Sequence, residues 1–159
     1  KSKIYIDGQA GTTALRIRDW LRDRDDLDVL VLPEELRKDT DARKKALRDA
    51  ALVVLCLPDD AAREAASWLA DSPVRILDAS TAHRVSHDWV YGLPELTSGQ
   101  REQIANANGF ESRLLFFGGH LLVRPLVDAG VLSPETPLSV HALSGYSGGG
   151  RSLIERWED

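Results

Sequence analysis

The chain has 159 residues, 43% of them hydrophobic, which is enough for one ordinary domain with its own core. Its formal net charge of -5 argues against a nucleic-acid-binding protein, which normally presents a basic face. No apolar run is long enough to span a bilayer, no signal-peptide pattern opens the chain, and the single Cys56 fits a reducing compartment. We therefore expect a cytoplasmic protein without nucleic-acid or membrane partners.

Two features of the sequence concern its ends. Methionine is absent, and the final "LIERWED" lies in a helix-like stretch that has no cap or breaker. We interpret the chain as a fragment, or as a gene product that ends early.

Apolar and amphipathic runs alternate along the first half of the chain. The apolar runs predict strands at 3–8, 27–33, 51–58 and 74–80. The runs between them predict helices at 9–26, 39–50 and 59–72. This alternation indicates an α/β fold of the Rossmann type, with a parallel sheet and helices on both faces.

The rhythm changes after Ser80. The stretch 81–103 is rich in loop residues, with a short helix expected from Ser98. The stretch 120–132 has a helical pattern despite Pro125. The stretch 137–150 is predicted to be a strand that runs into a Gly-rich loop.

A glycine-rich turn, "IDGQAGTTA", joins the first predicted strand to the first predicted helix. Gly8 permits a tight turn, Gly11 lets a pyrophosphate approach the helix N-terminus, and Ala14 allows the helix to pack closely on the sheet. Thr12 and Thr13 add hydroxyl donors. This strand–turn–helix context favours dinucleotide binding over a plain connecting turn.

Residues after the second predicted strand bear on the choice between NAD and NADP. Glu34 or Glu35 would hold the ribose 2′-hydroxyl of NAD, whereas Arg37 and Lys38 would bind the 2′-phosphate of NADP. Arg37 and Lys38 also fit a solvated helix start. The residues alone leave this choice open.

Cys56 ends the third predicted strand, at the edge where such sheets bind ligands. A nucleophilic thiolate needs a cationic neighbour or a helix N-terminus, whereas Asp59 and Asp60 would raise the pKa of the thiol. We therefore interpret Cys56 as a small apolar residue beside a cofactor.

The phrase "DASTAHR" follows the fourth predicted strand at the same edge. Arg84 can pair with a substrate carboxylate or phosphate, or can be a surface side chain on a loop. His83 and His87 lack the partners of a metal site, so no metal is expected. His120 and His141 are isolated, and we expect packing roles for both.

A second Gly-rich segment, "SGYSGGGR", runs from Ser144 to Arg151. Its backbone N–H groups can form an anion-binding nest, and Arg151 adds positive charge. A flexible connector is the alternative, but Tyr146 interrupts the Gly and Ser residues and favours a role at a substrate.

Six phrases in order resemble the shorter-chain form of N-acetyl-gamma-glutamyl-phosphate reductase: "IDGQAGTTALRIR", "LCLPDDAAREA", "DASTAHRV", "WVYGLPEL", "LVRPLVDAGVL" and "SGYSGGGRSLI". The resemblance implies an enzyme of arginine biosynthesis that uses NADPH to reduce an acyl phosphate to a semialdehyde with release of phosphate. A Cys attacks the acyl phosphate, the thioester accepts hydride, and a His later in the chain acts as acid and base. The full-length family is expected to form homo-oligomers.

The resemblance also implies domains and site residues. An NADP-binding Rossmann domain would cover 1–107, and 108–159 would begin an α+β catalytic and dimerisation domain. The residues implied for NADP are Gly8, Ala10, Gly11, Thr12, Thr13, Arg37, Lys38, Pro58, Ser80 and Thr81. Those implied for the substrate are Arg84, Ser144, Gly145, Tyr146, Ser147, Gly148 and Gly149.

The chain departs from the family at the nucleophile. The family phrase Ser-Asn-Pro-Gly-Cys-Tyr is missing, and "GFESRLLFFGGH" stands in its place, with the Cys expected at Leu114 or Leu115. One permitted set of codons for 110–117, TTC GAA TCC CGG CTG CTA TTC TTC, spells Ser-Asn-Pro-Gly-Cys-Tyr-Ser when it is read from its second nucleotide. We hypothesise two compensating frame errors, near 106–109 and 118–120; true divergence is the alternative.

Either origin leaves no catalytic residue in the literal chain, so we expect weak NADP binding without turnover. A non-catalytic Rossmann domain that binds a dinucleotide is the alternative function. The phrases at 78–84 and 144–150 disfavour a third reading, an aspartate-semialdehyde type of dehydrogenase.

Overall fold

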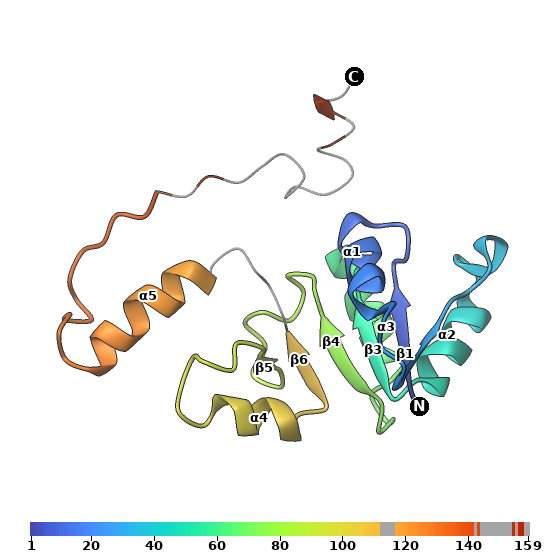
Figure 1. Ribbon diagram of the computed structural model, residues 1–159, viewed down its shortest axis with the longest axis horizontal. Coiled ribbons are helices and arrows are strands. Elements are labelled where there is room, and N and C mark those ends of the chain that lie inside the picture. The colour runs from blue at the N-terminus through green and yellow to red at the C-terminus, as the bar shows by residue number, and fades with distance from the viewer. Residues whose placement is uncertain (112–116, 142, 144–153, 155, 158–159) are drawn as a thin grey trace.

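The computed structural model of the protein describes residues 1–111, 117–141, 143, 154, 156 and 157. Figure 1 shows its elements along the chain. They are β1 (Ser2–Asp7), α1 (Thr12–Leu21), β2 (Leu27–Leu30), the 3₁₀ helix η1 (Glu34–Leu36), α2 (Thr40–Asp49), β3 (Leu52–Leu55), α3 (Asp59–Ser67), β4 (Arg75–Asp78), β5 (Val90–Tyr91), α4 (Gln100–Asn106), β6 (Gly109–Glu111) and α5 (Phe117–Asp128).

The strands form a six-stranded sheet in the order β2-β1-β3-β4-β6-β5, and neighbouring strands in it run parallel. The register places Asp7 beside Leu55, Leu55 beside Asp78, and Asp78 beside Glu111. Because parallel strands end at the same edge, the segments that follow β1, β3, β4 and β6 all begin along one side of the sheet. The predicted α/β fold with a parallel sheet is confirmed.

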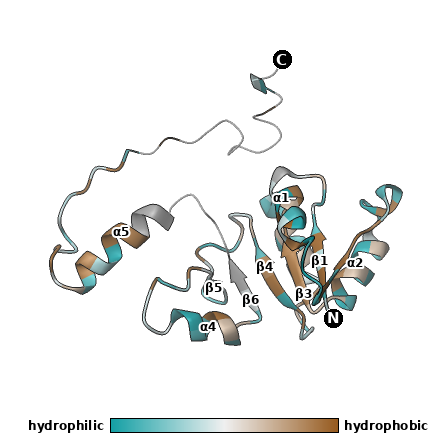
Figure 2. Ribbon diagram, in the orientation of Figure 1, coloured by the Kyte–Doolittle hydropathy of each residue, from teal (hydrophilic) through white to brown (hydrophobic). Residues whose placement is uncertain are grey.

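Each face of the sheet has its own core, because side chains alternate along a strand. Tyr5, Val53 and Leu55 pack with α2 and α3 on one face. Ile4, Ile6 and Val54 pack with Ala14 of α1 on the other. Ala14 is fully buried, as its predicted role in close helix packing requires. Figure 2 shows the hydrophobic colour concentrated on the central strands β1 and β3.

The predicted helices after Ser80 are confirmed as α4 and α5, and Pro125 lies within α5. Strands β5 and β6 were not predicted, since runs of two and three residues carry too little pattern. Arg75 of β4 holds the end of α4 through the carbonyls of Ile104 and Ala107, at 2.8 and 3.2 Å. This contact positions the end of α4 so that the following strand, β6, pairs with β4.

The strand predicted at 137–150 is wrong for the part that the structure describes. Residues 137–141 and 143 form no strand, and Leu138 and Val140 are exposed. A strand needs a hydrogen-bonded neighbour, and no strand pairing involves these residues. Residues 144–150 lie outside the described part of the chain.

Candidate functional site

The predicted site residues gather where β1 and β3 end. Strands β2 and β3 lie on opposite sides of β1, and α1 and α2 cover opposite faces of the sheet. The strand order therefore reverses at β1, and open α/β sheets bind their ligands at the carboxyl ends of the strands beside such a reversal. The residues that follow β1, β3 and β4 are the ones to build a site from.

The turn after β1 depends on glycine at its first position. Gly8 has a φ of 88°, and a Cβ there would lie 2.2 Å from the carbonyl oxygen of Cys56. The Gly11 N–H donates to the Gly8 carbonyl at 3.0 Å and closes the turn. A side chain at Gly8 would be strained by the backbone and would collide with the segment after β3.

The same turn holds donors that lack an acceptor. Gly11 is the N-cap of α1 and has no side chain with which to cap the first N–H groups of the helix. Gln9 is 6% exposed, and its Nε2 has no hydrogen-bond partner among the described residues. An uncapped helix start beside an unpaired buried amide fits the pyrophosphate of a dinucleotide. Thr12 begins α1, but its side chain is outside the described part.

A buried ion pair lies directly beneath the turn. Asp7, the last residue of β1, accepts bonds from Arg43 Nη2 at 2.8 Å and Arg43 Nε at 3.3 Å. The Asp7 Oδ1 also accepts from the Gly8 N–H at 3.1 Å. Burial, and then the negative charge of Asp7, raises the pKa of the neighbouring Tyr5 hydroxyl. This pair connects the turn to α2.

Cys56 is unsuited to nucleophilic attack. Burial, followed by the negative charges of Asp78 and Asp7, raises the pKa of its thiol to about 12. The interpretation of Cys56 as a small apolar residue, rather than a nucleophile, therefore has a physical basis. The carboxylates that raise this pKa are Asp78 and Asp7 rather than the predicted Asp59 and Asp60. The reason is that β3 lies between β1 and β4, the strands that end in Asp7 and Asp78. Pro58 is the N-cap residue of α3.

The residues predicted to choose between NAD and NADP follow β2. Glu34 and Glu35 lie in η1, and Arg37 forms an ion pair with Glu34. Lys38 is exposed, immediately before Asp39, the N-cap residue of α2. Both cations thus lie just before α2, as expected for the solvated helix start that was the alternative to a phosphate site.

The loop after β4 is organised by a fully buried carboxylate, Asp78. Its oxygens accept from the Ser80 N–H and the Ser80 hydroxyl, each at 2.9 Å, and its Oδ2 lies 2.7 Å from His83 Nδ1. The Ser80 Oγ in turn accepts from the Ala82 N–H at 3.0 Å. The Ser80 hydroxyl hydrogen is therefore already used in the bond to Asp78.

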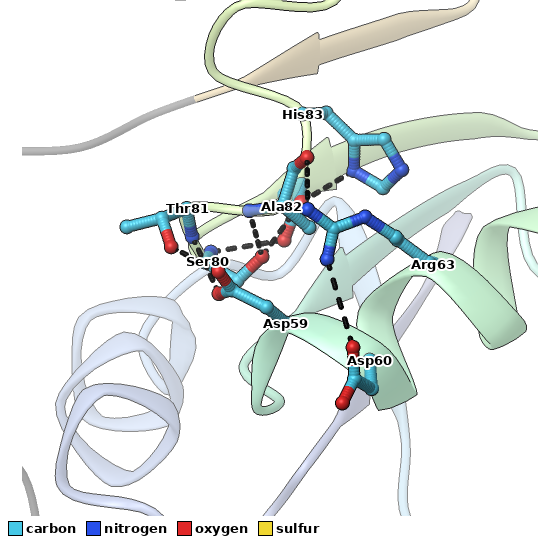
Figure 3. A network of polar contacts seen from close by, with 8 residues as sticks. Asp59, Asp60, Arg63, Ser80, Thr81, Ala82 and His83 are labelled. Carbon is cyan, nitrogen blue, oxygen red and sulfur yellow. Dashed lines mark hydrogen bonds and ion pairs between the residues drawn. The ribbon is translucent and has the colours of Figure 1, made fainter.

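A second carboxylate holds the same loop from α3. Figure 3 shows Asp59 facing Thr81 across the loop. Asp59 accepts from the Thr81 N–H at 3.0 Å and from the Thr81 hydroxyl. Arg63, one turn further along α3, donates to the Ala82 carbonyl at 3.1 Å. Carboxylates on two elements thus fix the backbone and the hydroxyls of Ser80 and Thr81.

An aromatic stack joins this loop to β6. The rings of His83 and Trp89 are nearly parallel, with centroids 3.9 Å apart. A Cβ at Gly109, the first residue of β6, would lie 3.1 Å from two atoms of the Trp89 ring. Strand β6 then ends at Glu111 beside Asp78. Of the residues in these contacts, His83 alone was singled out from the sequence.

The remaining residues singled out from the sequence either lie away from the glycine turn in the chain or fall outside the described residues. Arg84 is half-buried in the loop after β4, and His87 is exposed. His141 is exposed, with Nε2 3.2 Å from Ser139 Oγ, so its predicted packing role is wrong because its segment is itself exposed. Leu114, Leu115 and Ser144–Gly149 lie outside the described residues, as does the side chain of His120.

The described residues offer neither a metal-binding cluster nor a membrane-spanning helix. They contain no group of three or more His, Cys, Asp or Glu side chains placed to hold a metal ion. Among the helices in the same part of the chain, none combines the length and the apolar character needed to cross a membrane.

The sheet, its reversal at β1 and the glycine turn define a domain of the class that binds nicotinamide dinucleotides. A family model described as "Semialdehyde dehydrogenase, NAD binding domain" matches residues 14–107. The chain belongs to this family.

Curated relatives carry the name that the sequence motifs suggested. The N-acetyl-gamma-glutamyl-phosphate reductase of Trichormus variabilis is 50% identical over 159 residues, covering 99% of this chain and 49% of the relative. The protein of that name from Brucella suis is 52% identical over 161 residues, covering 100% of this chain and 52% of the relative. The predicted resemblance is confirmed, and the chain spans about half the length of these relatives.

Solved structures share the fold at low sequence identity. Aspartate semialdehyde dehydrogenase II of Vibrio cholerae, complexed with ASA, has a TM-score of 0.68 at 16% identity, covering 99% of this chain and 51% of that one. The Francisella tularensis aspartate semialdehyde dehydrogenase has a TM-score of 0.65 at 15% identity, with coverages of 98% and 48%. At these identities the likeness concerns the fold alone.

Proposed function

We propose that the chain is the cofactor-binding part of an N-acetyl-gamma-glutamyl-phosphate reductase. The reaction would be the NADPH-dependent reduction of N-acetyl-gamma-glutamyl phosphate to the semialdehyde, with release of phosphate, in arginine biosynthesis. The observation that carries the proposal is the 50% identity to a reductase of that name over 99% of the chain, with its glycine turn built around Gly8. The full-length protein is proposed to be a cytoplasmic homo-oligomer.

The glycine turn would hold the pyrophosphate of NADP. Gly8, Ala10 and Gly11 would supply the close backbone, Thr12 and Thr13 hydroxyls, and Gln9 its unpaired amide. Arg37 and Lys38 would face the 2′-phosphate, and Pro58, Ser80 and Thr81 would border the nicotinamide. When bound, the nicotinamide supplies the hydride.

The nucleophile of such a reductase would follow β6. Strand β6 ends at Glu111 beside Asp78, at the edge that carries the glycine turn, and Leu114 is three residues further along the chain. The segment that carries the expected Cys position would therefore leave the sheet at the edge where the cofactor is proposed to bind. Cys56 would not replace it, because its thiol stays protonated at neutral pH. The literal chain should bind cofactor without turning over substrate.

On the substrate side, Arg84 would pair with the acyl phosphate or a carboxylate. Ser144, Gly145, Tyr146, Ser147, Gly148 and Gly149 would complete that side as an anion-binding nest. Residues 108–159 would then begin the catalytic domain, although β6 itself extends the sheet of the cofactor domain.

A second candidate is a dinucleotide-binding domain without catalysis. The observation in its favour is a complete glycine turn in a chain without a reactive thiol. Titration with NADPH, followed by an assay of the reaction, separates the two candidates when done before and after 110–115 is replaced by the family phrase, with each chain joined to the C-terminal half of the Trichormus variabilis relative. Reductase activity that appears only after replacement supports the reductase, provided the replaced chain also binds NADPH. Tight binding with no activity in either protein supports the second candidate.

The origin of 108–119 is tested directly by sequencing the coding DNA. The frame hypothesis predicts a TGC triplet across the codons of Leu114 and Leu115, with single-nucleotide changes on both sides. An unambiguous read that lacks this triplet supports divergence instead.

A further inference from the structure

The buried Asp7–Arg43 pair connects two places that the proposed function assigns to one cofactor. Asp7 ends β1 directly before Gly8, whereas Arg43 belongs to the first turn of α2. Their side chains are 4% and 13% exposed, and Arg43 approaches Asp7 with two nitrogens. A planar guanidinium held by two bonds restricts orientation as well as distance.

On the β1 side, the pair reaches the backbone of the glycine turn. Asp7 Oδ1 accepts from the Gly8 N–H at 3.1 Å as well as from Arg43 Nε. The turn is packed closely here, because even a Cβ at Gly8 would lie 2.2 Å from the Cys56 carbonyl oxygen. A movement of the Asp7 carboxylate would therefore displace the backbone of the turn that is proposed to hold the pyrophosphate.

On the α2 side, the pair reaches the segment proposed to bind the 2′-phosphate. The Arg43 N–H donates to the Asp39 carbonyl at 3.0 Å, and Asp39 directly follows Lys38. Asp39 also caps the helix, since its Oδ1 accepts from the Ala42 N–H at 2.7 Å. The ring of Trp68, the residue directly after α3, has its centroid 5.0 Å from the Arg43 guanidinium carbon and limits the movement of Arg43 from the other side.

We infer that Asp7 and Arg43 are a positioning pair for cofactor choice: they fix the start of α2, with Arg37 and Lys38, at a set place relative to the glycine turn. The inference rests on the proposed function, because it assumes that both places bind NADP. NADP spans both places, whereas NAD lacks the 2′-phosphate and depends on the turn. Loss of the pair should therefore weaken NADP binding more than NAD binding.

The test measures dissociation constants for NADPH and NADH on the chain as it exists. The variants are Asp7→Asn, Arg43→Met and the double variant. The double variant leaves no unpaired buried charge, so it keeps the test available if a single variant fails to fold. Arg124→Met with Asp128→Asn is the matched control, since that pair is exposed on α5. Thermal unfolding of each protein reports stability separately.

We expect the NADPH dissociation constant to rise about tenfold in the double variant and the NADH constant to change less than about threefold. The control should leave both constants unchanged. An equal change for both nucleotides, or no change, overturns the inference while the proposed function stands. Tighter NADPH binding in Asp7→Asn also overturns it, because it makes the freed Arg43 a direct phosphate ligand. A wild-type chain that does not bind NADPH, or does not prefer it to NADH, refutes the NADP proposal itself and the inference with it.

Discussion

Residues 1–111 and residues 117–141 carry similar apolar side chains, but these side chains are mostly buried or half-buried in the first region and largely exposed in the second. In the first region, each strand of the sheet has a hydrogen-bonded neighbour, and Leu47 and Val53 are fully buried. In the second region, Leu122 and Val131 are 73% and 74% exposed, and Figure 1 shows α5 set apart from the sheet. An apolar pattern therefore predicts an element, whereas burial depends on the elements that lie against it.

The largest effect that separates the regions is expected at their two glycines with positive φ. Gly8 has a φ of 88° and would place a Cβ 2.2 Å from a carbonyl oxygen, whereas Gly130 has a φ of 67° and open space. Both substitutions to Ala strain the backbone, but only Gly8→Ala also causes a collision. We expect Gly8→Ala to lower the free energy of unfolding by about 4 kcal/mol and Gly130→Ala by about 1 kcal/mol.

Urea unfolding at equilibrium checks both values, and NADPH titration of Gly8→Ala should show loss of binding. Similar losses of stability in the two variants would mean that the contact between the turn and Cys56 is not tight.

A smaller effect is expected at Gly109, where β6 passes Trp89. The methyl group of Gly109→Ala would approach the Trp89 ring to 3.1 Å, which requires the ring to move. We expect a loss of about 2 kcal/mol in the free energy of unfolding. The loss should be much smaller when Gly109→Ala is added to Trp89→Leu, because the smaller side chain leaves room. Equal losses in the two backgrounds would show that the ring is not the obstacle.

The buried thiol of Cys56 should make the stability of the first region depend on alkaline pH. Its pKa is about 12 when folded, compared with an ordinary value of 9.0 for an exposed thiol, so the unfolded chain loses this proton first. The stabilising contribution is complete below pH 9 and disappears as the pH rises toward 12. At pH 10, one unit above the unfolded value, we expect a loss of about 1.4 kcal/mol.

The free energy of unfolding at pH 8 and pH 10, compared between wild type and Cys56→Ala, isolates this contribution. Tyr5 also titrates above its usual range, and the comparison removes it because both proteins carry it. An identical pH dependence in the two proteins would contradict the assignment to Cys56.

The smallest effect is expected in the second region. Leu122→Ser replaces a side chain that is 73% exposed, so the free energy of unfolding should change by no more than about 0.5 kcal/mol. Leu47 is fully buried between α2 and the sheet, and Leu47→Ala should cost about 3 kcal/mol. A large loss for Leu122→Ser, measured by urea unfolding, would show that α5 is packed in solution.

The sequence predicted what depends on local pattern. Alternating apolar runs located β1 to β4, and the spacing of Gly8, Gly11 and Ala14 located the turn, because backbone freedom and helix packing need those residue types. It did not reveal Arg43 as the partner of Asp7, which lies 36 positions away in the chain. An acidic residue at the end of an apolar strand was the available signal, since a buried carboxylate requires a cation or several donors.

The missed strands and the wrongly predicted strand have the same cause. Two-residue β5 exists because β6 accompanies it, and β6 exists because β4 and the Trp89 contact accompany it. Residues 137–141 have the stronger strand pattern but no pairing partner among the described residues. Whether each segment forms a strand depends on pairing with a segment distant in the sequence, and the periodicity within one segment carries no information about that pairing.

The hydroxyls after β4 determine what kind of group can meet them. The Ser80 and Thr81 hydroxyl hydrogens point to Asp78 and Asp59, so the oxygens offer lone pairs only. A ligand atom that docks against them has to bring its own hydrogen, as an amide NH₂ does. Carboxylates and phosphates would be repelled there, although the turn after β1 favours them. A molecule that lies across both places must therefore be anionic at one end and a hydrogen donor at the other.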